Sequence, residues 1–312
     1  MPTKSILFLC GFSLLLLNNG CGGKKAAEPV DPAAALEGRM KAAEKLSDPA
    51  TQAEEYLAIA GELLNSAQLP ASQKSLKLAG EAIGKITTAP AKGRLAAELS
   101  ILYARSKQSA ESQTALGQAQ AALAKLGDDA LARTLLQSRI AVAQQELGSK
   151  KTAQTTLQAA ATAAAAITDV ESQTRGWLGV ARAAKALEDT ATQQTAFDKA
   201  QASAKTAATP RLQSELTVEL ARAQHDVDQK SDAEETLKSA LTTIETIGDP
   251  LNRGYALLEA AGTRVLWGDA EQGKALLEQL EKSFDSIPDK DQVKQLQAKV
   301  KTQRAQLAKL KK

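Results

Sequence analysis

The sequence predicts an all-α protein, a right-handed α-solenoid of about six stacked helix-turn-helix repeats of about 40 residues each. Three observations predict this class. Alanine and leucine carry most of the hydrophobic content and aromatic residues make up only 3 %, a composition that favours helices over strands. Two series of residues recur every 40 positions. All nine prolines lie near the N-terminus or at corners between predicted helices, where they interrupt no helix.

Residues 1–20 resemble a secretory signal peptide. Lys4 supplies the positive charge of such a segment, and residues 6–17 form its apolar run. A transmembrane helix needs about 20 apolar residues, so this run is too short to span a bilayer. We therefore expect residues 1–20 to direct export.

Cys21 is the candidate attachment point for lipid. Cys10 leaves with the signal peptide, so Cys21 is then the sole thiol and no intrachain disulfide is possible. The sequence Asn18-Asn19-Gly20-Cys21 resembles the lipobox of bacterial lipoproteins, although Asn18 stands where leucine is usual. The resemblance implies that Cys21 is acylated and anchors the chain to a membrane. A plain secreted protein and an uncleaved signal anchor are the alternatives.

The segment after the cysteine places the anchor. Residues 21–30 are polar, contain glycine and proline, and read as a flexible tether. Gly22 is not the aspartate that retains some lipoproteins at the inner membrane. We therefore expect the protein in the cell envelope outside the cytoplasm, with the outer membrane or periplasm favoured.

The repeat is visible in two independent series. Each series is spaced by 40, 40, 41, 40, 40 and 40 residues, and the single insertion falls between the same two units. The corner series begins at Leu46, Ile86, Leu126, Ile167, Ala207, Ile247 and Ile287. The second series consists of Leu36, Leu76, Leu116, Leu157, Phe197, Leu237 and Leu277.

Each unit is predicted to contain two helices. The first, of about 17 residues, follows a corner such as Asp249-Pro250, where a capping residue precedes a proline. The second begins at a polar break, with Asp269 or Ser231 as the cap. Glycines inside the helices indicate close helix approach, and these are Gly61, Gly93, Gly176, Gly179, Gly254 and Gly262.

The ends of the array differ from its middle. The solenoid is predicted over residues 31–288 and opens with a half unit, a lone second helix. Residues 289–312 are predicted to form a basic capping helix, because one polar face keeps a terminal helix soluble. Its apolar stripe consists of Val293, Leu296, Val300, Leu307 and Leu310.

The repeat resembles the tetratricopeptide class. Leu257, Ala261, Gly268, Gly273 and Leu277 fall near the hydrophobic, small and loop-glycine places of that family, and the resemblance covers nearly the whole mature chain. The unit is longer than the roughly 34 residues of the family. The resemblance implies an extended concave face that binds a protein or peptide.

The sequence offers little for catalysis. There is one histidine, His225, which either pairs with Asp226 or is solvated at a helix end. One histidine and one acylated cysteine cannot build a metal site from imidazole and thiolate ligands. Carboxylate neighbours such as Glu54 and Glu55 read as a solvated face. A net charge of +3 from 39 basic and 36 acidic residues gives no case for nucleic-acid binding.

Two features are candidate binding sites. Arg182 and Arg222 occupy the same repeat position, so stacked units would display them together for a carboxylate or phosphate. The alternative for Arg222 is an intrahelical partner, Glu219. The second feature is the basic C-terminal helix, which could contact anionic lipid or an acidic partner or could be a solvated cap. Its candidate residues are Lys299, Lys301 and Arg304.

The sequence therefore predicts a membrane-anchored exported scaffold or adaptor that binds a protein or peptide, possible roles being envelope assembly or secretion. The alternative is a structural spacer without a specific ligand. We expect no enzyme activity, cofactor, metal, nucleic-acid partner or small-molecule substrate.

Overall fold

The structure, a computed structural model, describes residues 32–310. The predicted signal peptide, Cys21 and the tether lie outside the described residues, so lipid attachment stays a prediction. None of the helices within residues 32–310 combines the length and apolar character needed to cross a membrane.

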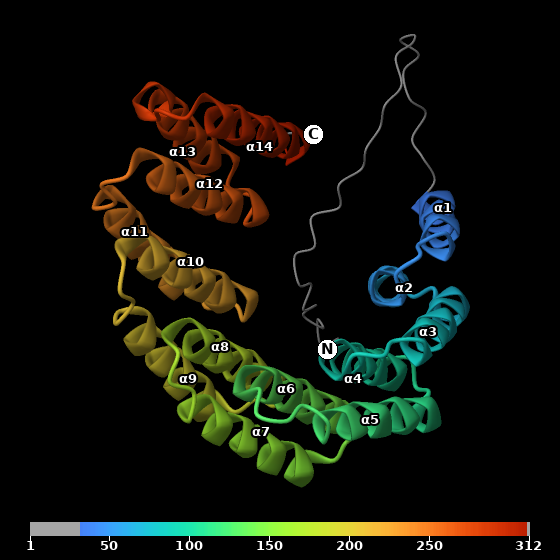
Figure 1. Cartoon of the computed structure of the whole chain (residues 1–312). Coiled ribbons are helices and arrows are strands. Elements are labelled where there is room, and N and C mark those ends of the chain that lie inside the picture. Colours follow the sequence, from blue (N-terminus) through green and yellow to red (C-terminus); the bar gives the residue numbers. More distant parts are fainter. Residues whose placement is uncertain (1–31, 311–312) are drawn as a thin grey trace.

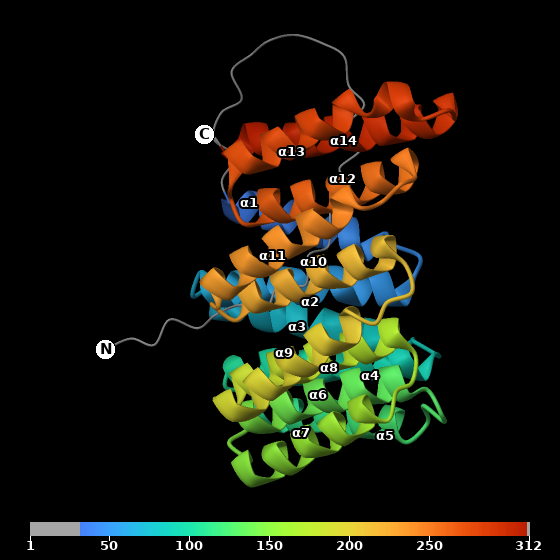
Figure 2. The same cartoon turned by 90° about the vertical axis from the view of Figure 1, so that its left-hand side faces the viewer.

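The predicted α-solenoid is confirmed. Residues 32–310 form fourteen α-helices, one short 3₁₀-helix η1 (Phe284–Ser286) and no strands. Figure 1 shows the helices as an arc of two layers that opens between the first and last helices, and Figure 2 shows them stacked roughly parallel to one another. The outer layer consists of α1 (Pro32–Glu44), α3 (Leu69–Gly84), α5 (Ser109–Leu123), α7 (Lys150–Ala165), α9 (Thr190–Ala204), α11 (Lys230–Glu245) and α13 (Ala270–Lys282).

The even-numbered helices line the inside of the arc. Each contacts the next even-numbered helix as well as its own outer partner. They are α2 (Pro49–Asn65), α4 (Ala89–Arg105), α6 (Ala130–Glu146), α8 (Val170–Ala186), α10 (Pro210–Asp226), α12 (Pro250–Leu266) and α14 (Lys290–Leu310).

The hydrophobic core runs along the array and has no single centre. It divides into three clusters, which extend over residues 43–140, 141–227 and 218–307. Each cluster takes residues from several consecutive hairpins, so a helical hairpin buries its apolar face against its neighbours. This sharing is what a repeat that cannot close a core alone requires.

Most predicted helix starts are confirmed, but one is wrong. Asp249 caps α12, since its carboxylate accepts a hydrogen bond from the backbone N–H of Asn252 at 2.7 Å, and Asp269 caps α13 in the same way. Ser231 is not a cap. Helix α11 already begins at Lys230, after a capping residue, Gln229, that makes no side-chain bond.

The early start of α11 follows from the turn that joins the two helices of each unit. The residue two places after the first helix has a positive φ, and the next N–H bonds back to a carbonyl five residues earlier. This tight turn leaves room for few linking residues, and only two of its six left-handed positions are glycine. The six are Ala67, Lys107, Gly148, Glu188, Asp228 and Gly268.

A second recurring device joins successive units. At the fourth position of an inner helix a long polar side chain reaches back to carbonyl oxygens at the end of the preceding outer helix. Gln52 donates to the Ala43 carbonyl at 3.1 Å, and Gln173 donates to the Ile167 carbonyl at 2.6 Å. Lys92 and Arg133 make equivalent bonds to Gly84 and Gly127. These bonds add donors to carbonyls at or just after the ends of the outer helices, where intrahelical donors run out, although the Ala43 carbonyl also accepts from the Leu46 N–H.

The prediction of close approach holds for five of the six mid-helix glycines. A Cβ added at Gly179 would lie 2.6 Å from Leu135 Cδ2, and one added at Gly262 would lie 2.9 Å from Gln303 Nε2. Gly93, Gly176 and Gly254 are similarly crowded. The prediction is wrong for Gly61, where a Cβ would meet no atom within 4 Å.

Helix α14 closes the described array. It packs on α12 and α13 through Val293, Leu296, Val300 and Leu307, which are buried as the stripe predicts. Leu310 is 47 % exposed and does not belong to that stripe. The reason is its position at the end of the helix, beyond the inner helix on which α14 packs.

Candidate functional site

The inner layer carries a series of ion pairs that join consecutive helices, which we call the inner-face ladder. It begins with Glu54–Arg94 between α2 and α4, where the two side chains are in contact. The pairs that follow are Glu98–Arg139 at 2.8 Å, Arg105–Glu146 at 2.7 Å, Arg175–Glu219 at 2.7 Å, Arg182–Asp226 at 3.1 Å and Arg222–Glu259 at 3.8 Å. Arg175 also contacts Glu215 of α10 at 3.6 Å, and Glu215 contacts Arg211 of its own helix at 3.8 Å. Acidic and basic side chains are therefore balanced in these inner-face contacts.

Both predicted ladder arginines lie on this face, and both are bonded to the next inner helix. Arg182 Nη2 donates to Asp226 Oδ2 at 3.1 Å. Arg222 donates to Thr263 Oγ1 at 2.7 Å and to the Glu259 carbonyl at 3.0 Å. The intrahelical alternative is wrong, because Glu219 instead accepts three hydrogen bonds from Arg175 of α8, the preceding inner helix.

Two pKa values at these seams are shifted, one by hydrogen bonding and the other by burial. Hydrogen bonds to Glu219 are the main cause of a raised pKa at Arg175, so its guanidinium stays charged. Burial raises the pKa of the Glu259 carboxyl, and the charge of Arg222 offsets only part of this effect. Arg222 therefore compensates the buried Glu259 carboxylate only in part.

The interpretation of Glu54 and Glu55 as a solvated face is wrong, because both are half-buried and ion-paired. Glu54 contacts Arg94, and Glu55 accepts a hydrogen bond from Arg39 of α1 at 2.8 Å. Glu234 contacts Arg264 at 2.6 Å. Neighbouring carboxylates on one helix thus reach different helices, a relation that the sequence of one helix does not show.

His225 follows neither of its two predicted alternatives. Its ring stacks on Trp267 at the end of α12, with ring centroids 4.7 Å apart and planes inclined by 8°. Burial lowers the pKa of His225, and the nearby charge of Lys230 acts in the same direction. The histidine therefore joins α10 to the end of α12 as an aromatic contact.

Arg264 of α12 also contacts the indole of Trp267. Its side chain is only 4 % exposed, contacts Glu234 and Asp269, and lies 5.4 Å from the centre of the Trp267 ring. Residues 32–310 contain no group of three histidine, cysteine, aspartate or glutamate side chains that could hold a metal ion. The cluster is thus a packing contact between repeats.

The three candidates on α14 have different partners, although Lys301 and Arg304 line the same depression. Lys299 lies 4.9 Å from the centre of the Tyr255 ring, and Arg304 donates to Glu281 at 2.7 Å. Lys301 lines a shallow depression of about 420 Å³ beside Phe284 and Val300. Only Lys301 of the three has no ion-pair or ring partner in the described part of the chain.

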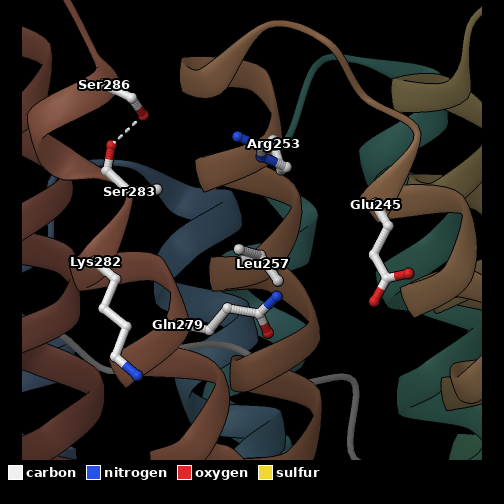
Figure 3. A pocket seen from close by; sticks show the side chains of 7 residues that line it. All are labelled: Glu245, Arg253, Leu257, Gln279, Lys282, Ser283 and Ser286. Atoms are coloured by element: carbon white, nitrogen blue, oxygen red, sulfur yellow. Dashed lines mark hydrogen bonds between the residues drawn. The ribbon is translucent and has the colours of Figure 1, made fainter.

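A second shallow depression, of about 350 Å³, lies between α11, α12 and α13. Figure 3 shows Glu245 on one side and Lys282 on the other, with Leu257 and Arg253 between them. Arg253 occupies the repeat position of Gln52 and Gln173. The lining offers charge but no pairing of nucleophile and base, and it consists of Glu245, Arg253, Leu257, Gln279, Lys282, Ser283 and Ser286.

The fold and the inner face define the chain as an α-solenoid repeat protein. No family model matches the chain, and no curated protein sequence matches it. Among similar solved structures, Ton1535 of Thermococcus onnurineus is 18 % identical over 86 % of this chain and 84 % of that chain, with a TM-score of 0.31. A Rap protein complexed with Competence and Sporulation Factor is 13 % identical over 87 % of this chain and 80 % of that chain, with a TM-score of 0.37. The TPR-like repeats of a putative kinesin light chain from Podosopora anserina are 21 % identical over 64 % of this chain and 97 % of that chain, with a TM-score of 0.36.

Proposed function

We propose that this chain is a binding scaffold that presents the inside of its arc to a protein or peptide. The observation that carries the proposal is the continuous inner layer from α2 to α14, which displays the charged side chains of the six ladder pairs at four of its seams. Extended repeat surfaces of this kind suit recognition of a long partner.

The ladder also defines the chemistry of the partner. Opposite charges are balanced, so the face provides no strong long-range attraction for an acidic or a basic molecule. A partner of mixed charge can exchange ion pairs with the arginines and carboxylates at short range. Arg182 and Arg222 remain the candidate contacts, because each offers a guanidinium that a partner carboxylate could share.

A structural spacer is the second candidate, and the same ladder favours it. Each ladder charge already has a partner within the described chain, so the pairs serve to hold the stack together without any ligand. In this function the length of the array matters and the identity of the inner-face side chains does not.

The anchor belongs to the proposal as well. Acylation of Cys21 would tie the N-terminal end of the array to a membrane of the cell envelope, outside the cytoplasm, with residues 22–30 as the tether. Scaffolding in envelope assembly or secretion fits such a location.

Site-directed photocrosslinking in the native host tests the binding function. A photoreactive residue at Ala186, on the inner layer, is expected to give a discrete adduct with another protein, whereas one at Lys199, on an outer helix, is the matched control and should give none. Arg182→Glu with Arg222→Glu should abolish the adduct. The double variant Arg182→Glu/Asp226→Arg keeps an ion pair at this seam but exchanges the positions of its positive and negative charges. Loss of the adduct in this variant would therefore reflect lost recognition rather than lost stability.

The outcomes separate the two functions. A partner identified by mass spectrometry from the Ala186 adduct, and lost on reversal, supports the scaffold. The absence of an inner-face adduct, or an adduct that survives both reversals, contradicts the scaffold and leaves the spacer.

A further inference from the structure

The ion pairs that link repeats are distributed unevenly between the two layers. The six ladder pairs all join one inner helix to the next inner helix. Within residues 32–310 no ion pair joins two outer helices. Ion pairs between helices of the same layer therefore lie on the inner side of the array only, whereas Glu234–Arg264 and Glu281–Arg304 each join an outer helix to the inner helix of the next unit.

The position of these pairs allows them to affect the curvature of the arc. Inner helices approach one another on the inside of the arc shown in Figure 1. When the arc opens, the distance between consecutive inner helices grows, and each ladder pair lengthens. The ladder thus opposes opening, whereas the apolar clusters that run between the layers hold each hairpin to the next in either state.

Solvent reaches the ladder. The exposed fractions of its side chains range from 24 %, as for Glu54, to 41 %, as for Arg94. Ion pairs with this exposure are weakened by dissolved salt, because counterions compete with the partner for each charge. The buried Arg264, at 4 % exposure, is protected from this effect and stands outside the ladder.

Two seams between inner helices, α6–α8 and α12–α14, carry none of the six ladder pairs. Between α6 and α8 the helices approach closely at Gly179, where Leu135 of α6 occupies the space that a side chain would need. This contact is apolar and is not weakened by screening. The seam that it forms is expected to keep its geometry while the flanking seams respond.

We infer that the inner-face ladder sets the curvature of the solenoid, so that ionic strength or a charged partner that exchanges with its pairs changes the opening of the arc. The device does not depend on the proposed function, because it concerns contacts within this chain. It would let a scaffold adjust its inner face to a partner, and it would make a spacer extend or contract with the salt around it.

Small-angle X-ray scattering of the full chain tests this inference. We expect a larger radius of gyration at about 1 M NaCl, where the Debye length is about 3 Å, than at about 0.01 M, where it is about 30 Å. Circular dichroism at both salt concentrations should show unchanged helicity, so that opening is distinguished from unfolding.

Charge reversal sharpens the test because it predicts a change of sign. In the triple variant Arg94→Glu, Arg105→Glu and Arg182→Glu, like charges face each other across three seams. This variant should be more open than the wild type at low salt and should contract as salt is added. If the variant fails to fold by circular dichroism, the neutral variant takes its place, with Arg94, Arg105, Arg182 and their partners changed to glutamine or asparagine.

The neutral variant should show a smaller response to salt than the wild type. The inference is overturned if the wild-type radius of gyration is the same at both salt concentrations, or if a folded reversed or neutral variant responds to salt as the wild type does.

Discussion

Gly93→Ala is expected to lower the free energy of unfolding by about 1–3 kcal/mol, the usual cost of overpacking a filled interior. A Cβ at this position would lie 2.6 Å from Leu136 Cδ2 and 2.9 Å from Ala122 Cβ. The leucine methyl can rotate away, but the alanine Cβ is attached directly to the backbone of α5. Relief of the clash therefore requires α4 and α5 to separate.

Gly61→Ala is the matched control, and we expect the opposite sign. Gly61 also lies inside an inner helix, but a Cβ there would meet no atom within 4 Å. Alanine should therefore stabilise α2 by up to about 1 kcal/mol through helix propensity alone.

Chemical denaturation followed by circular dichroism measures both changes. The double variant Gly93→Ala/Ala122→Gly should recover part of the loss, since one methyl group is removed where another is added. Equal effects of the two alanine substitutions would contradict the close packing of α4 against α5.

Cys21→Ser is expected to move the protein from the membrane pellet to the soluble fraction of the native host. Each buried methylene of an acyl chain contributes about 0.8 kcal/mol of membrane affinity, and several chains give stable anchoring. Among residues 32–310 no helix could replace that anchor by spanning a membrane. Cell fractionation and immunoblotting give the measurement.

Cys10→Ser is the control for this experiment, and it should leave the protein in the pellet because Cys10 lies within the predicted signal peptide. Retention of Cys21→Ser in the pellet would show that lipid on this residue is not the anchor. A protein found outside the cell in both forms would support the secreted alternative.

The fold could be predicted from the sequence because the same pattern of residues recurs in every repeat. The corner residues recur at a fixed spacing, so the hairpin, its two helix lengths and the shared core follow from the periodic apolar pattern. The left-handed turn residues could not be recognised by residue type, since four of the six are not glycine. Their common spacing of 40 or 41 residues was the available signal.

The candidate site was harder to predict because it depends on the lateral offset between stacked helices. The period shows which positions are equivalent, but Arg182 reaches a partner 44 residues away and Arg222 reaches a carbonyl 37 residues away. These two sequence separations differ by about two turns of helix. The same limit explains why the stacking of His225 on Trp267, which lies 42 positions further on, was not predicted.

Deletion of residues 210–249 tests the central claim, that stacked hairpins share their apolar faces and no single core exists. The deletion removes α10 and α11 and joins Thr209 to Pro250, which keeps the threonine–proline corner. It also brings Glu259 to the repeat position of Glu219, opposite Arg175.

Circular dichroism with thermal unfolding decides the matter. We predict that this shortened chain keeps the helicity of its remaining residues and unfolds cooperatively, whereas deletion of residues 230–249, which removes α11 alone, disrupts the neighbouring hairpins. Loss of helicity throughout the chain after deletion of residues 210–249 would contradict the claim.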